Sequence, residues 1–370
     1  MNRNGMPTPA YAMEASDLSV IMGGQKVLEI PSLQILPNEV LVVIGPNCSG
    51  KTTLLLCLAS LLKPATGTIF YQGQPANNGT DLLRLRRRLA VVFQEPLLLN
   101  TTVWNNVTLG LRLRGEKREE IEKRAHKWLE RFGIASLAQR QARALSGGEA
   151  KRVSLARAFA LHPEVLFLDE PFAALDGPTR QALIEDFESV LRETKISTVM
   201  VTHDRNEAIV LASRVAVLIN GHIRQIGKPE DVFSYPVDED VASFVEAGNI
   251  MQGVVKAQSE GLASVNLGEQ QLYTVSNLTI GTKVTMFLRP EDITISLPTS
   301  QTSYSSARNN FAGKVVKAFP LGSQIRVSLD CGFPLVVLIT KRSWEDLGLE
   351  VSKAVVASFK ASSIHIIPRR

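Results

Sequence analysis

The chain has 370 residues and a mass of 40.5 kDa, and because a single domain usually has about 100 to 200 residues, two domains are expected. Its composition of 45% hydrophobic and 21% charged residues excludes wholesale disorder. The 41 basic residues outnumber the 36 acidic ones only slightly, so no nucleic-acid partner is expected from charge. The densest basic stretch, residues 84–88, is predicted to be a solvated helix face.

Nothing in the sequence is apolar over a length that could cross a membrane as a helix. The longest unbroken apolar run is residues 54–59, whereas a membrane helix needs about 18 or more such residues. The N-terminus has no signal-peptide pattern, so any pore is expected to belong to another polypeptide. The three cysteines, Cys48, Cys57 and Cys331, are too few and too scattered for a disulfide framework or a zinc cluster, which favours a reducing cytoplasm.

The first elements in chain order are a tail and a strand-loop-helix unit. Residues 1–14 are polar, contain proline and lack periodicity, so they are predicted to form a flexible tail. Residues 40–44 form a β-branched apolar run that leads into glycine, and residues 51–62 continue as an apolar helix. This order predicts a strand, a glycine loop and a helix.

The middle of the chain alternates predicted helices with buried strands. Residues 116–132 are charged, with apolar positions three and four apart, and predict an amphipathic helix in a helical insertion. The apolar runs 165–168 and 197–201 are predicted to be strands buried on both faces, as central strands of a parallel sheet are. Helices between these strands indicate an α/β core.

After residues 235–236 the chain changes to short alternating segments separated by glycine turns. Residues 313–318, 324–329 and 335–339 are examples. These segments predict a small β-barrel domain at the C-terminal end. Strand-rich stretches at 250–298 and 305–368 also suggest an internal doubling.

A phosphate-binding loop is predicted at residues 45–52, which have the sequence GPNCSGKT and match the pattern GxxxxGK[ST] between a strand and a helix. Its backbone N–H groups would surround the phosphates of ATP, helped by the positive end of the following helix. Lys51 is expected to reach the β and γ phosphates, and the Thr52 hydroxyl to hold Mg²⁺. The predicted nucleotide-binding residues are Gly45, Pro46, Asn47, Cys48, Ser49, Gly50, Lys51, Thr52 and Thr53. Alone, the pattern also fits a turn in which Lys51 is merely exposed.

A second predicted strand, residues 165–168, runs directly into Asp169 and Glu170. An acid at the end of an apolar strand is costly unless a cation lies there, and Mg²⁺ is the expected cation. Asp169 is therefore predicted to be the carboxylate on the metal side. Glu170 is predicted to be the general base that polarises the attacking water. Without the phosphate-binding loop, this pair would equally fit an ordinary strand terminus.

Residues 145–158, LSGGEAKRVSLARA, resemble the signature motif of ABC transporter ATPases. Ser146, Gly147 and Gly148, followed by Glu149, would offer a second phosphate site at a helix start. The local pattern alone would favour a capped helix start. The resemblance spans residues 16–247 and implies an ATPase domain at residues 15–247. That domain would be an α/β P-loop NTPase core of ABC type with a helical subdomain at about residues 95–160.

The order of further motifs is similar to that family. The resemblance implies that Gln94 senses the γ-phosphate and takes part in the metal site, that Asp176 lies in the D-loop, and that His203 is the switch histidine. A lone histidine such as His203 would otherwise be structural. Lys51, Glu170 and His203 are thus the predicted catalytic residues.

The partners expected from the resemblance follow from how such ATPases assemble. Two copies would form a homodimer in which the signature of one copy faces the phosphate-binding loop of the other. Residues 95–106 would receive a coupling helix of integral-membrane permease subunits, which in turn receive substrate from an extracytoplasmic binding protein. The chain is therefore expected at the cytoplasmic face of the cell membrane, as a peripheral subunit.

Two residues depart from the family pattern. Cys48 occupies a position where the family has glycine, and its side chain restricts the backbone if φ must be positive there. Slower turnover or redox sensitivity would follow. Met22 stands where an aromatic residue normally stacks on adenine, and a thioether can still pack on the base, with weaker nucleotide selectivity expected.

The C-terminal segment, residues 248–370, resembles the all-β, OB-like TOBE domains of importer ATPases, most of all the molybdate-binding kind. The likeness depends on SARN at 306–309 and KASS at 360–363, with flanking residues. Hydroxyls, backbone N–H groups and cations hold tetrahedral oxyanions. The expected ligands of molybdate or tungstate are Ser306, Arg308, Asn309, Lys360 and Ser362. Alternatively, these residues only stabilise barrel turns.

The function expected from the whole sequence is the ATP-hydrolysing subunit of a molybdate or tungstate importer, inhibited when its C-terminal domain binds the oxyanion. Importers of sulfate, sugars or polyamines are alternatives, because their ATPases share this core. A soluble ABC ATPase acting on nucleic acid or ribosomes would usually have a second cassette or a long coiled coil, and neither is visible. A non-catalytic anion-binding regulator would require a damaged ATP site, yet Lys51, Asp169, Glu170 and His203 are present.

Overall fold

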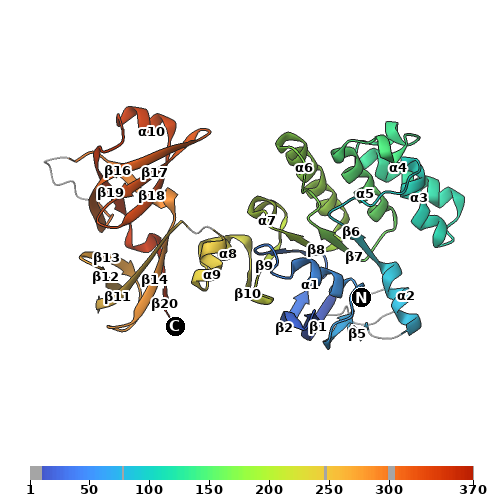
Figure 1. The fold of residues 1–370 in the computed structure, drawn as a ribbon, viewed down its shortest axis with the longest axis horizontal. Coiled ribbons are helices and arrows are strands. Elements are labelled where there is room, and N and C mark those ends of the chain that lie inside the picture. Colours follow the sequence, from blue (N-terminus) through green and yellow to red (C-terminus); the bar gives the residue numbers. More distant parts are fainter. Residues whose placement is uncertain (1–10, 77–78, 246–247, 299–304, 370) are drawn as a thin grey trace. The chain divides into compact units, whose positions relative to one another are not determined.

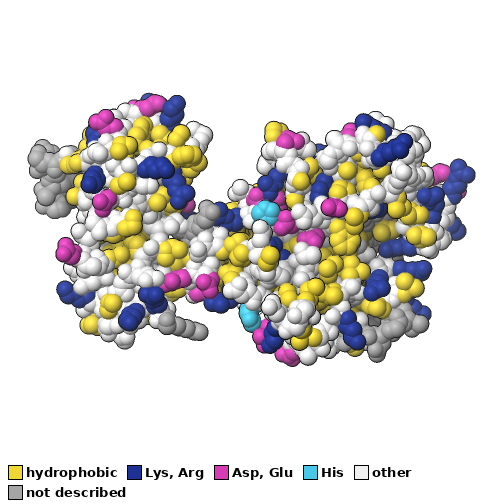
Figure 2. All heavy atoms as spheres, in the orientation of Figure 1, with side chains coloured by type: hydrophobic (Ala, Val, Ile, Leu, Met, Phe, Trp, Pro, Cys, Tyr) yellow, Lys and Arg dark blue, Asp and Glu magenta, His cyan; other side chains and the backbone are white. Residues whose placement is uncertain are grey.

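A computed structural model describes residues 11–76, 79–245, 248–298 and 305–369, and the chain divides into two compact units at Val232 and Phe233 (Figure 1). No helix within the described residues is long and apolar enough to cross a membrane. Basic and acidic side chains are intermingled on the face of each unit that Figure 2 shows. This mixture agrees with the small charge imbalance of the sequence.

The first unit contains a six-stranded sheet with the order β10-β9-β3-β8-β7-β6. β6, β7, β8, β3 and β9 are parallel neighbours, and β10 pairs antiparallel with β9 at one edge. The strands are β3 (Val40–Ile44), β6 (Leu89–Val92), β7 (Val165–Asp169), β8 (Ser197–Thr202), β9 (Arg214–Ile219) and β10 (His222–Gly227). Every residue of β3, β7 and β8 is buried, which confirms the predicted central strands.

A second sheet of the first unit has the order β2-β1-β4-β5. Its strands are β1 (Met13–Met22), β2 (Gln25–Ile35), β4 (Thr66–Tyr71) and β5 (Gln74–Pro75). The predicted tail, residues 1–14, is wrong at its end, because Met13 and Glu14 belong to β1 and Met13 is fully buried. Alternation of buried Met13 and Ala15 with more exposed neighbours was the missed strand signal. Residues 1–10 of that tail lie outside the described residues.

Helix α1 (Lys51–Leu58) packs its Leu54, Leu55 and Leu58 into the core shared with both sheets. The helix ends earlier than the predicted residue 62. Ala59 is its C-cap, and Ser60 adopts a left-handed conformation with φ of 57°. A left-handed residue cannot continue a right-handed helix, so the apolar run outlasts the helix.

The other helices of the first unit include a helical group, α3 to α5, that lies within the residues predicted for the helical subdomain (Figure 1). Its aromatic core joins Trp128, Phe132 and Phe159, with Phe187 of α6 against Phe159. The helices are α2 (Gly79–Arg88), α3 (Val103–Leu113), α4 (Arg118–Arg131), α5 (Gly147–Ala160), α6 (Gly177–Thr194) and α7 (Arg205–Leu211), with short 3₁₀ turns at Ala135–Leu137 and Ala142–Ala144.

The division between the units comes earlier than the predicted boundary after residue 247. Helix α8 (Pro229–Ser234) spans the division, and α9 (Glu239–Phe244) belongs to the second unit. Glu239 accepts hydrogen bonds from Thr285 at 2.5 Å and from Gln252 at 2.9 Å. These contacts attach the connecting segment to the β-rich unit, and no local sequence pattern indicates them.

The second unit is built from two five-stranded antiparallel sheets, with orders β13-β12-β11-β14-β20 and β15-β19-β16-β17-β18. The first half contributes β11 (Asn249–Ser259), β12 (Leu262–Leu267), β13 (Gln270–Val275), β14 (Lys283–Leu288), the 3₁₀ turn Pro290–Asp292 and β15 (Thr294–Ser296). The second half contributes β16 (Asn309–Leu321), β17 (Gln324–Asp330), β18 (Pro334–Thr340), α10 (Lys341–Asp346), β19 (Ala354–Phe359), the 3₁₀ turn Ala361–Ser363 and β20 (Ile364–Pro368). The suggested doubling is confirmed, with the last strand of each half exchanged into the other sheet.

A buried asparagine at the start of each half joins the two halves. The Asn249 amide donates to the carbonyl of Val336 at 2.9 Å and accepts from its N–H at 2.5 Å. Asn309 makes the same pair of bonds with Tyr273, both at 2.8 Å. Since Val336 and Tyr273 lie in the third strand of the opposite half, each asparagine fixes one half against the other.

Removing one of these amides should destabilise the second unit. We expect Asn249→Ala to lower the free energy of unfolding by about 2 kcal/mol, because it leaves the partly buried N–H and carbonyl of Val336 unpaired. Thermal unfolding followed by calorimetry measures the loss. Gln258→Ala, at an exposed position of β11, is the control and should stay within about 0.5 kcal/mol of the unmodified protein. Equal stability of the two variants would contradict the proposed tie.

Candidate functional site

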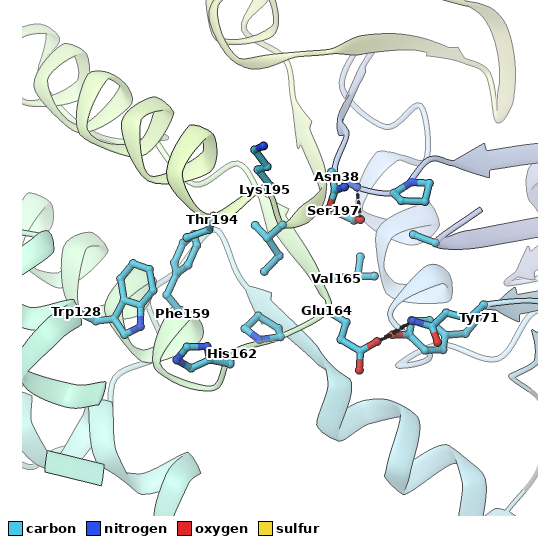
Figure 3. A pocket seen from close by; sticks show the side chains of 15 residues that line it. Asn38, Tyr71, Trp128, Phe159, His162, Glu164, Val165, Thr194, Lys195 and Ser197 are labelled. Carbon is cyan, nitrogen blue, oxygen red and sulfur yellow. Dashed lines mark hydrogen bonds between the residues drawn. The ribbon is translucent and has the colours of Figure 1, made fainter. Parts of the chain in front are cut away.

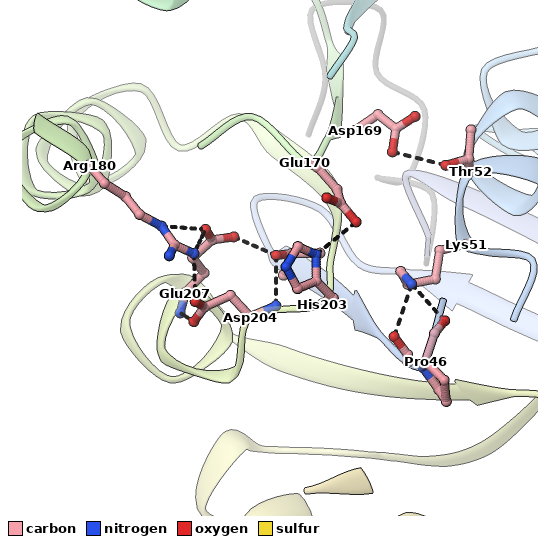
Figure 4. A network of polar contacts seen from close by, with 11 residues as sticks. Pro46, Lys51, Thr52, Asp169, Glu170, Arg180, His203, Asp204 and Glu207 are labelled. Carbon is pink, nitrogen blue, oxygen red and sulfur yellow. Dashed lines mark hydrogen bonds and ion pairs between the residues drawn. The ribbon is translucent and has the colours of Figure 1, made fainter. Parts of the chain in front are cut away.

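The carboxyl ends of three parallel strands gather the predicted catalytic residues at one edge of the central sheet. β3 ends in the loop of residues 45–50, β7 ends with Asp169 before Glu170, and β8 ends before His203. Parallel strands place their following loops at the same edge, where open α/β sheets bind their ligands. Figure 4 shows Lys51, Thr52, Asp169, Glu170 and His203 around this edge.

Glycine is required at two positions of the phosphate-binding loop. A Cβ on Gly45 would lie 2.0 Å from the Leu218 carbonyl oxygen. Gly50 has a φ of 101°, and a Cβ there would lie 2.6 Å from the Leu28 side chain. Cys48 is exposed and has a φ of 62°. A positive φ is unfavourable for a residue with a side chain and costs about 1 kcal/mol, so Cys48 is strained where the family has glycine.

Lys51 is almost buried, with 7% of its surface exposed, and its Nζ donates to the carbonyls of Gly45 and Pro46 at 2.9 Å each. Burial lowers the pKa of Lys51, and the nearby Glu170 and Asp169 carboxylates oppose that shift. The buried Ser49 hydroxyl has no hydrogen-bond partner among the described residues. A buried ammonium, an unpaired hydroxyl and a helix N-terminus fit a phosphate group.

Asp169 and Thr52 face each other across the gap between β7 and α1. The Thr52 hydroxyl donates to Asp169 Oδ1 at 3.1 Å, and Asp169 is 6% exposed. Burial raises the pKa of Asp169, while the hydrogen bond from Thr52 and the charge of Lys51 act in the opposite direction. A hydroxyl and a carboxylate that converge in this way are oxygen ligands of the kind that Mg²⁺ takes.

Glu170 is paired with His203 at this edge. Glu170 Oε1 lies 3.0 Å from His203 Nδ1, and the Glu170 N–H donates to the Val201 carbonyl at 2.9 Å. Glu170 has a φ of 42°, a left-handed conformation that non-glycine residues rarely adopt. Such strain is often found at functional sites, where the surroundings hold it in place. Here the bond to β8 supplies that hold, and it directs the carboxylate toward His203.

The guanidinium of Arg180, which was not among the predicted site residues, fixes the segment next to His203. Arg180, in the first turn of α6, donates to Asp204 at 2.6 Å and to Glu207 at 2.5 Å (Figure 4). Glu207 is 2% exposed and accepts from the Thr202 hydroxyl at 2.6 Å. Asp204 caps α7, so Arg180 holds the segment that follows His203, and Glu207 links that segment to Thr202 on the other side of His203. The spacing Asp204-x-x-Glu207 after a strand was the available signal.

The remaining residues of the predicted site lie at loop and helix starts. Ser146 and Glu149 form a capping box at α5, in which the Ser146 N–H donates to Glu149 at 2.7 Å. Asp176 caps α6 by accepting from the Thr179 N–H at 3.0 Å. Gln94 is exposed after β6, and Met22, at the end of β1, is 52% exposed. The capped helix start considered for Ser146 is thus present, and it leaves the N–H groups of Gly147 and Gly148 at the helix start.

Part of the predicted oxyanion cluster lies at one end of the β16–β19 pair in the second unit. Asn309 of β16 is paired with Phe359 of β19, and Arg308 directly precedes that pair on one strand while Lys360 directly follows it on the other. Both side chains are exposed, and neither forms an ion pair with any residue that the structure describes. Ser306 and Ser362 are also exposed on the same two segments. Asn309 is the exception: its side chain is 1% exposed and bonded to Tyr273, so its prediction as a ligand side chain was wrong.

A separate cavity of about 460 Å³ lies at the opposite, amino-terminal end of β7 and β8 (Figure 3). Its lining includes Trp128, His162, Glu164 and Ser197. Glu164 there is already bonded to Arg88 at 2.7 Å. The lining contains none of the described residues of the phosphate-binding loop, so this cavity is not part of the nucleotide site.

Comparisons with known proteins agree with this geometry. A model of the ABC transporter family matches residues 28–173, and a model of the TOBE domain matches residues 305–366. The molybdate/tungstate import ATP-binding protein of Pyrococcus horikoshii is 36% identical, covering 93% of this chain and 96% of that protein. The chain belongs to the ABC transporter ATP-binding proteins. It is therefore an ATPase that binds ATP and is coupled to transport, with the predicted P-loop core and C-terminal TOBE domain confirmed.

Other members of the family import different substrates. The sulfate/thiosulfate import ATP-binding protein of Thermosynechococcus vestitus is 32% identical over 92% of this chain and 94% of that protein. The spermidine/putrescine import ATP-binding protein of Fusobacterium nucleatum is 34% identical over 77% of each. The solved structure of cbiO1 from Clostridium perfringens, part of the ABC transporter complex cbiONQ, matches with a TM-score of 0.57 at 29% identity. That match covers 64% of this chain and 95% of that one.

The role of Arg180 in this ABC protein can be tested through stability. We expect Arg180→Met to lower the free energy of unfolding by about 3 kcal/mol near neutral pH, because it leaves the buried Glu207 carboxylate without its cation. Burial already raises the pKa of Glu207, and the loss of Arg180 raises it further above the value in the unfolded chain. Stability from such a group is present below its unfolded pKa and is lost as pH rises through the folded pKa.

Denaturant unfolding across pH provides the measurement. The deficit of Arg180→Met should be larger at about pH 8 than at about pH 5, where Glu207 is more readily protonated. Arg192→Met on the same helix is the matched control, since Arg192 is 77% exposed and pairs with Glu188 one turn away. Its loss should cost about 0.5 kcal/mol or less. A deficit that does not depend on pH would show that Glu207 is not the group that Arg180 compensates.

Proposed function

We propose that this chain is the ATP-hydrolysing subunit of an importer of molybdate or tungstate. The observation that supports this substrate is the pair of exposed cations, Arg308 and Lys360, which flank the paired residues Asn309 and Phe359 at one end of β16 and β19 in the TOBE domain. Two cations with nearby hydroxyls suit a tetrahedral dianion. The relatives named as molybdate/tungstate import proteins match along almost the whole chain, which is consistent with that substrate.

The same cation pair argues against one alternative and leaves another. A polyamine is itself a cation and would be repelled by Arg308 and Lys360. Sulfate is a tetrahedral dianion like molybdate and would suit the same residues. Sulfate and the larger oxyanions therefore differ at this site in size and in how strongly they would bind. A direct measurement of binding distinguishes them.

Within the ATP site, we assign a role to each residue from its position. Lys51 would exchange its bonds to the Gly45 and Pro46 carbonyls for the β and γ phosphates of ATP. Mg²⁺ would neutralise phosphate charge between Thr52, Asp169 and Gln94. Glu170 would accept the proton of the water that attacks the γ-phosphorus. His203 would orient the Glu170 carboxylate relative to the γ-phosphate. Met22, exposed at the end of β1, would pack on adenine.

We infer that two copies act as a homodimer. Within the described residues, the hydrogen bonds made by the side chains of Ser146 and Glu149 involve only each other's residue and Arg140, and none reaches the phosphate-binding loop of the same chain. The N–H groups of Gly147 and Gly148 therefore suit a nucleotide held by a second copy. Asp176, which precedes α6, would lie in the same interface as the D-loop residue.

A groove of about 500 Å³ on the first unit supports the proposed permease contact. Leu99 and Asn106, both from the segment predicted to receive a coupling helix, line it. Leu113 contributes another apolar side chain and is 72% exposed. An apolar groove rimmed by arginines suits an amphipathic helix. A permease bound there would hold the chain at the cytoplasmic face of the membrane as a peripheral subunit, with an extracytoplasmic binding protein delivering the oxyanion.

Oxyanion binding is the central test of this function. Titration calorimetry of the purified chain should detect molybdate or tungstate binding more strongly than sulfate, and the Arg308→Ala/Lys360→Ala variant should weaken binding by about tenfold or more, since charge-assisted bonds are lost. Arg342→Ala, an exposed change in α10 of the same unit, is the control and should bind like the unmodified chain. Unchanged affinity in the double variant would reject the assigned site. Stronger binding of sulfate would favour the sulfate alternative.

The catalytic role of Glu170 is tested separately. We expect Glu170→Gln to retain ATP binding and to reduce the turnover number by about 100-fold or more, because an amide cannot take the proton of the attacking water. Single-turnover hydrolysis measures the chemical step, and filter binding shows retained nucleotide. Glu164→Gln, an acid at the opposite end of β7, is the control and should hydrolyse ATP at nearly the native rate. Native turnover in Glu170→Gln would remove Glu170 as the base.

A further inference from the structure

A buried lysine on α5 holds the backbone of Gln94. Lys151 is 4% exposed, and its Nζ donates to the Gln94 carbonyl. Burial lowers the pKa of Lys151, and the charges of Asp169 and Glu170 oppose that shift. No carboxylate in the described part of the chain lies within ion-pair distance of its Nζ. The direct partner of this ammonium is therefore a loop carbonyl.

The same face of α5 also holds Pro96 and Leu97 of that loop. Arg157 donates to the Pro96 carbonyl at 2.8 Å and to the Leu97 carbonyl at 3.0 Å. The Ser154 hydroxyl lies 3.5 Å from the Pro96 carbonyl, at the limit of a hydrogen bond. Lys151, Ser154 and Arg157 recur at every third position, so they lie along one side of the helix.

The loop has little other support at this point. Among the described hydrogen bonds, the carbonyls of residues 94–97 accept only from side chains of α5. Backbone–backbone hydrogen bonds in the segment between β6 and α3 begin at the Thr101–Leu99 pair among the described residues. Leu97 has a φ of 44°, a left-handed conformation that needs such support. The position of Gln94 is thus set by α5, whose first turn starts at Ser146.

We propose that Lys151 is a positioning residue that holds Gln94 in place for ATP hydrolysis and makes Gln94 follow the movements of α5. The inference rests on the phosphate- and metal-facing role proposed above for Gln94. Because α5 also begins with the signature residues, the Lys151–Gln94 bond joins the part of the chain that faces a second copy to the part that faces the γ-phosphate of its own nucleotide.

A different reading of the buried ammonium is that it acts as a counter-charge for Asp169 and Glu170. Two substitutions separate the readings. Lys151→Gln is one atom shorter, keeps an N–H donor and removes the charge, whereas Lys151→Met removes both. If the bond to Gln94 matters, the glutamine variant should resemble the unmodified protein and the methionine variant should not. If charge matters, the two variants should behave alike.

The first measurement is amide hydrogen exchange in the nucleotide-free full-length protein. Lys151→Met should speed exchange in residues 93–102 by about tenfold, because the loss of a buried hydrogen bond lowers the cost of local opening. Arg152→Met is the matched control: it removes a neighbouring cation of α5 that bonds Asp186 and the Phe132 carbonyl and does not touch the loop. It should leave exchange in residues 93–102 unchanged.

The second measurement is the Mg²⁺ concentration that gives half-maximal ATPase activity at saturating ATP. Lys151→Met should raise it by about five- to tenfold, in the same direction as Gln94→Ala, and the double variant should be no worse than Gln94→Ala alone. Lys151→Gln should restore most of the loss. Arg157→Gln releases the other end of the loop and should shift both measurements in the same direction, which keeps the test available if Lys151→Met does not fold.

The outcomes separate the inference from the function on which it rests. If Gln94→Ala shows native Mg²⁺ dependence, the proposed role of Gln94 fails. If Gln94→Ala is altered while Lys151→Met keeps native exchange and native Mg²⁺ dependence, the positioning role of Lys151 is overturned. Additive losses in the double variant, or equal losses in the glutamine and methionine variants, would also overturn it.

Discussion

Four charged side chains at the carboxyl edge of the central sheet are almost completely removed from water: Lys51, Lys151, Asp169 and Glu207, each 7% exposed or less. A desolvated charge is costly unless an opposite charge or several hydrogen bonds compensate it. Each of the four has a hydrogen-bond or ion-pair partner outside its own helix or strand. Lys51 is held by loop carbonyls, Lys151 by Gln94, Asp169 by Thr52 and Glu207 by Arg180. These contacts couple the loops of the site, because moving one loop would leave a buried charge of another loop without its partner.

This arrangement also explains why the site suits a phosphate. The ammonium of Lys51 is satisfied only by carbonyl oxygens, and the buried hydroxyl of Ser49 has no partner among the described residues. A phosphate oxygen is a stronger acceptor than a carbonyl because it is charged. The strained backbone at Cys48 and Glu170 lies in the loops that follow β3 and β7, next to the expected position of that phosphate. Two of the residues with a left-handed backbone therefore lie where the nucleotide would add new contacts.

The sequence predicted the elements whose signal is local. The strands at 40–44, 165–168 and 197–201 are continuous apolar runs, and a strand buried on both faces needs no more than that. The predicted tail was wrong at Met13 because alternating burial over a few residues is a weak pattern. The contacts of Arg180 and Lys151 could not be predicted, since their partners lie 24 to 57 positions away and only the folded sheet edge brings them together. Asn309 shows the reverse case: its place in a motif suggested a ligand, and its amide is buried against Tyr273.

The duplicated second unit separates what the fold needs from what binding needs. Asn249 and Asn309 occupy equivalent positions and make equivalent bonds, so each half keeps the contact that closes the unit. The turns after β14 and β19 are not equivalent in chemistry. The second half has Ser362 and Ser363 in its turn, whereas the first half has Glu291 and Asp292, whose carboxylates repel an oxyanion. The closing contact is thus present in both halves, whereas the cation-hydroxyl cluster occurs once in the described residues and is not part of that shared contact.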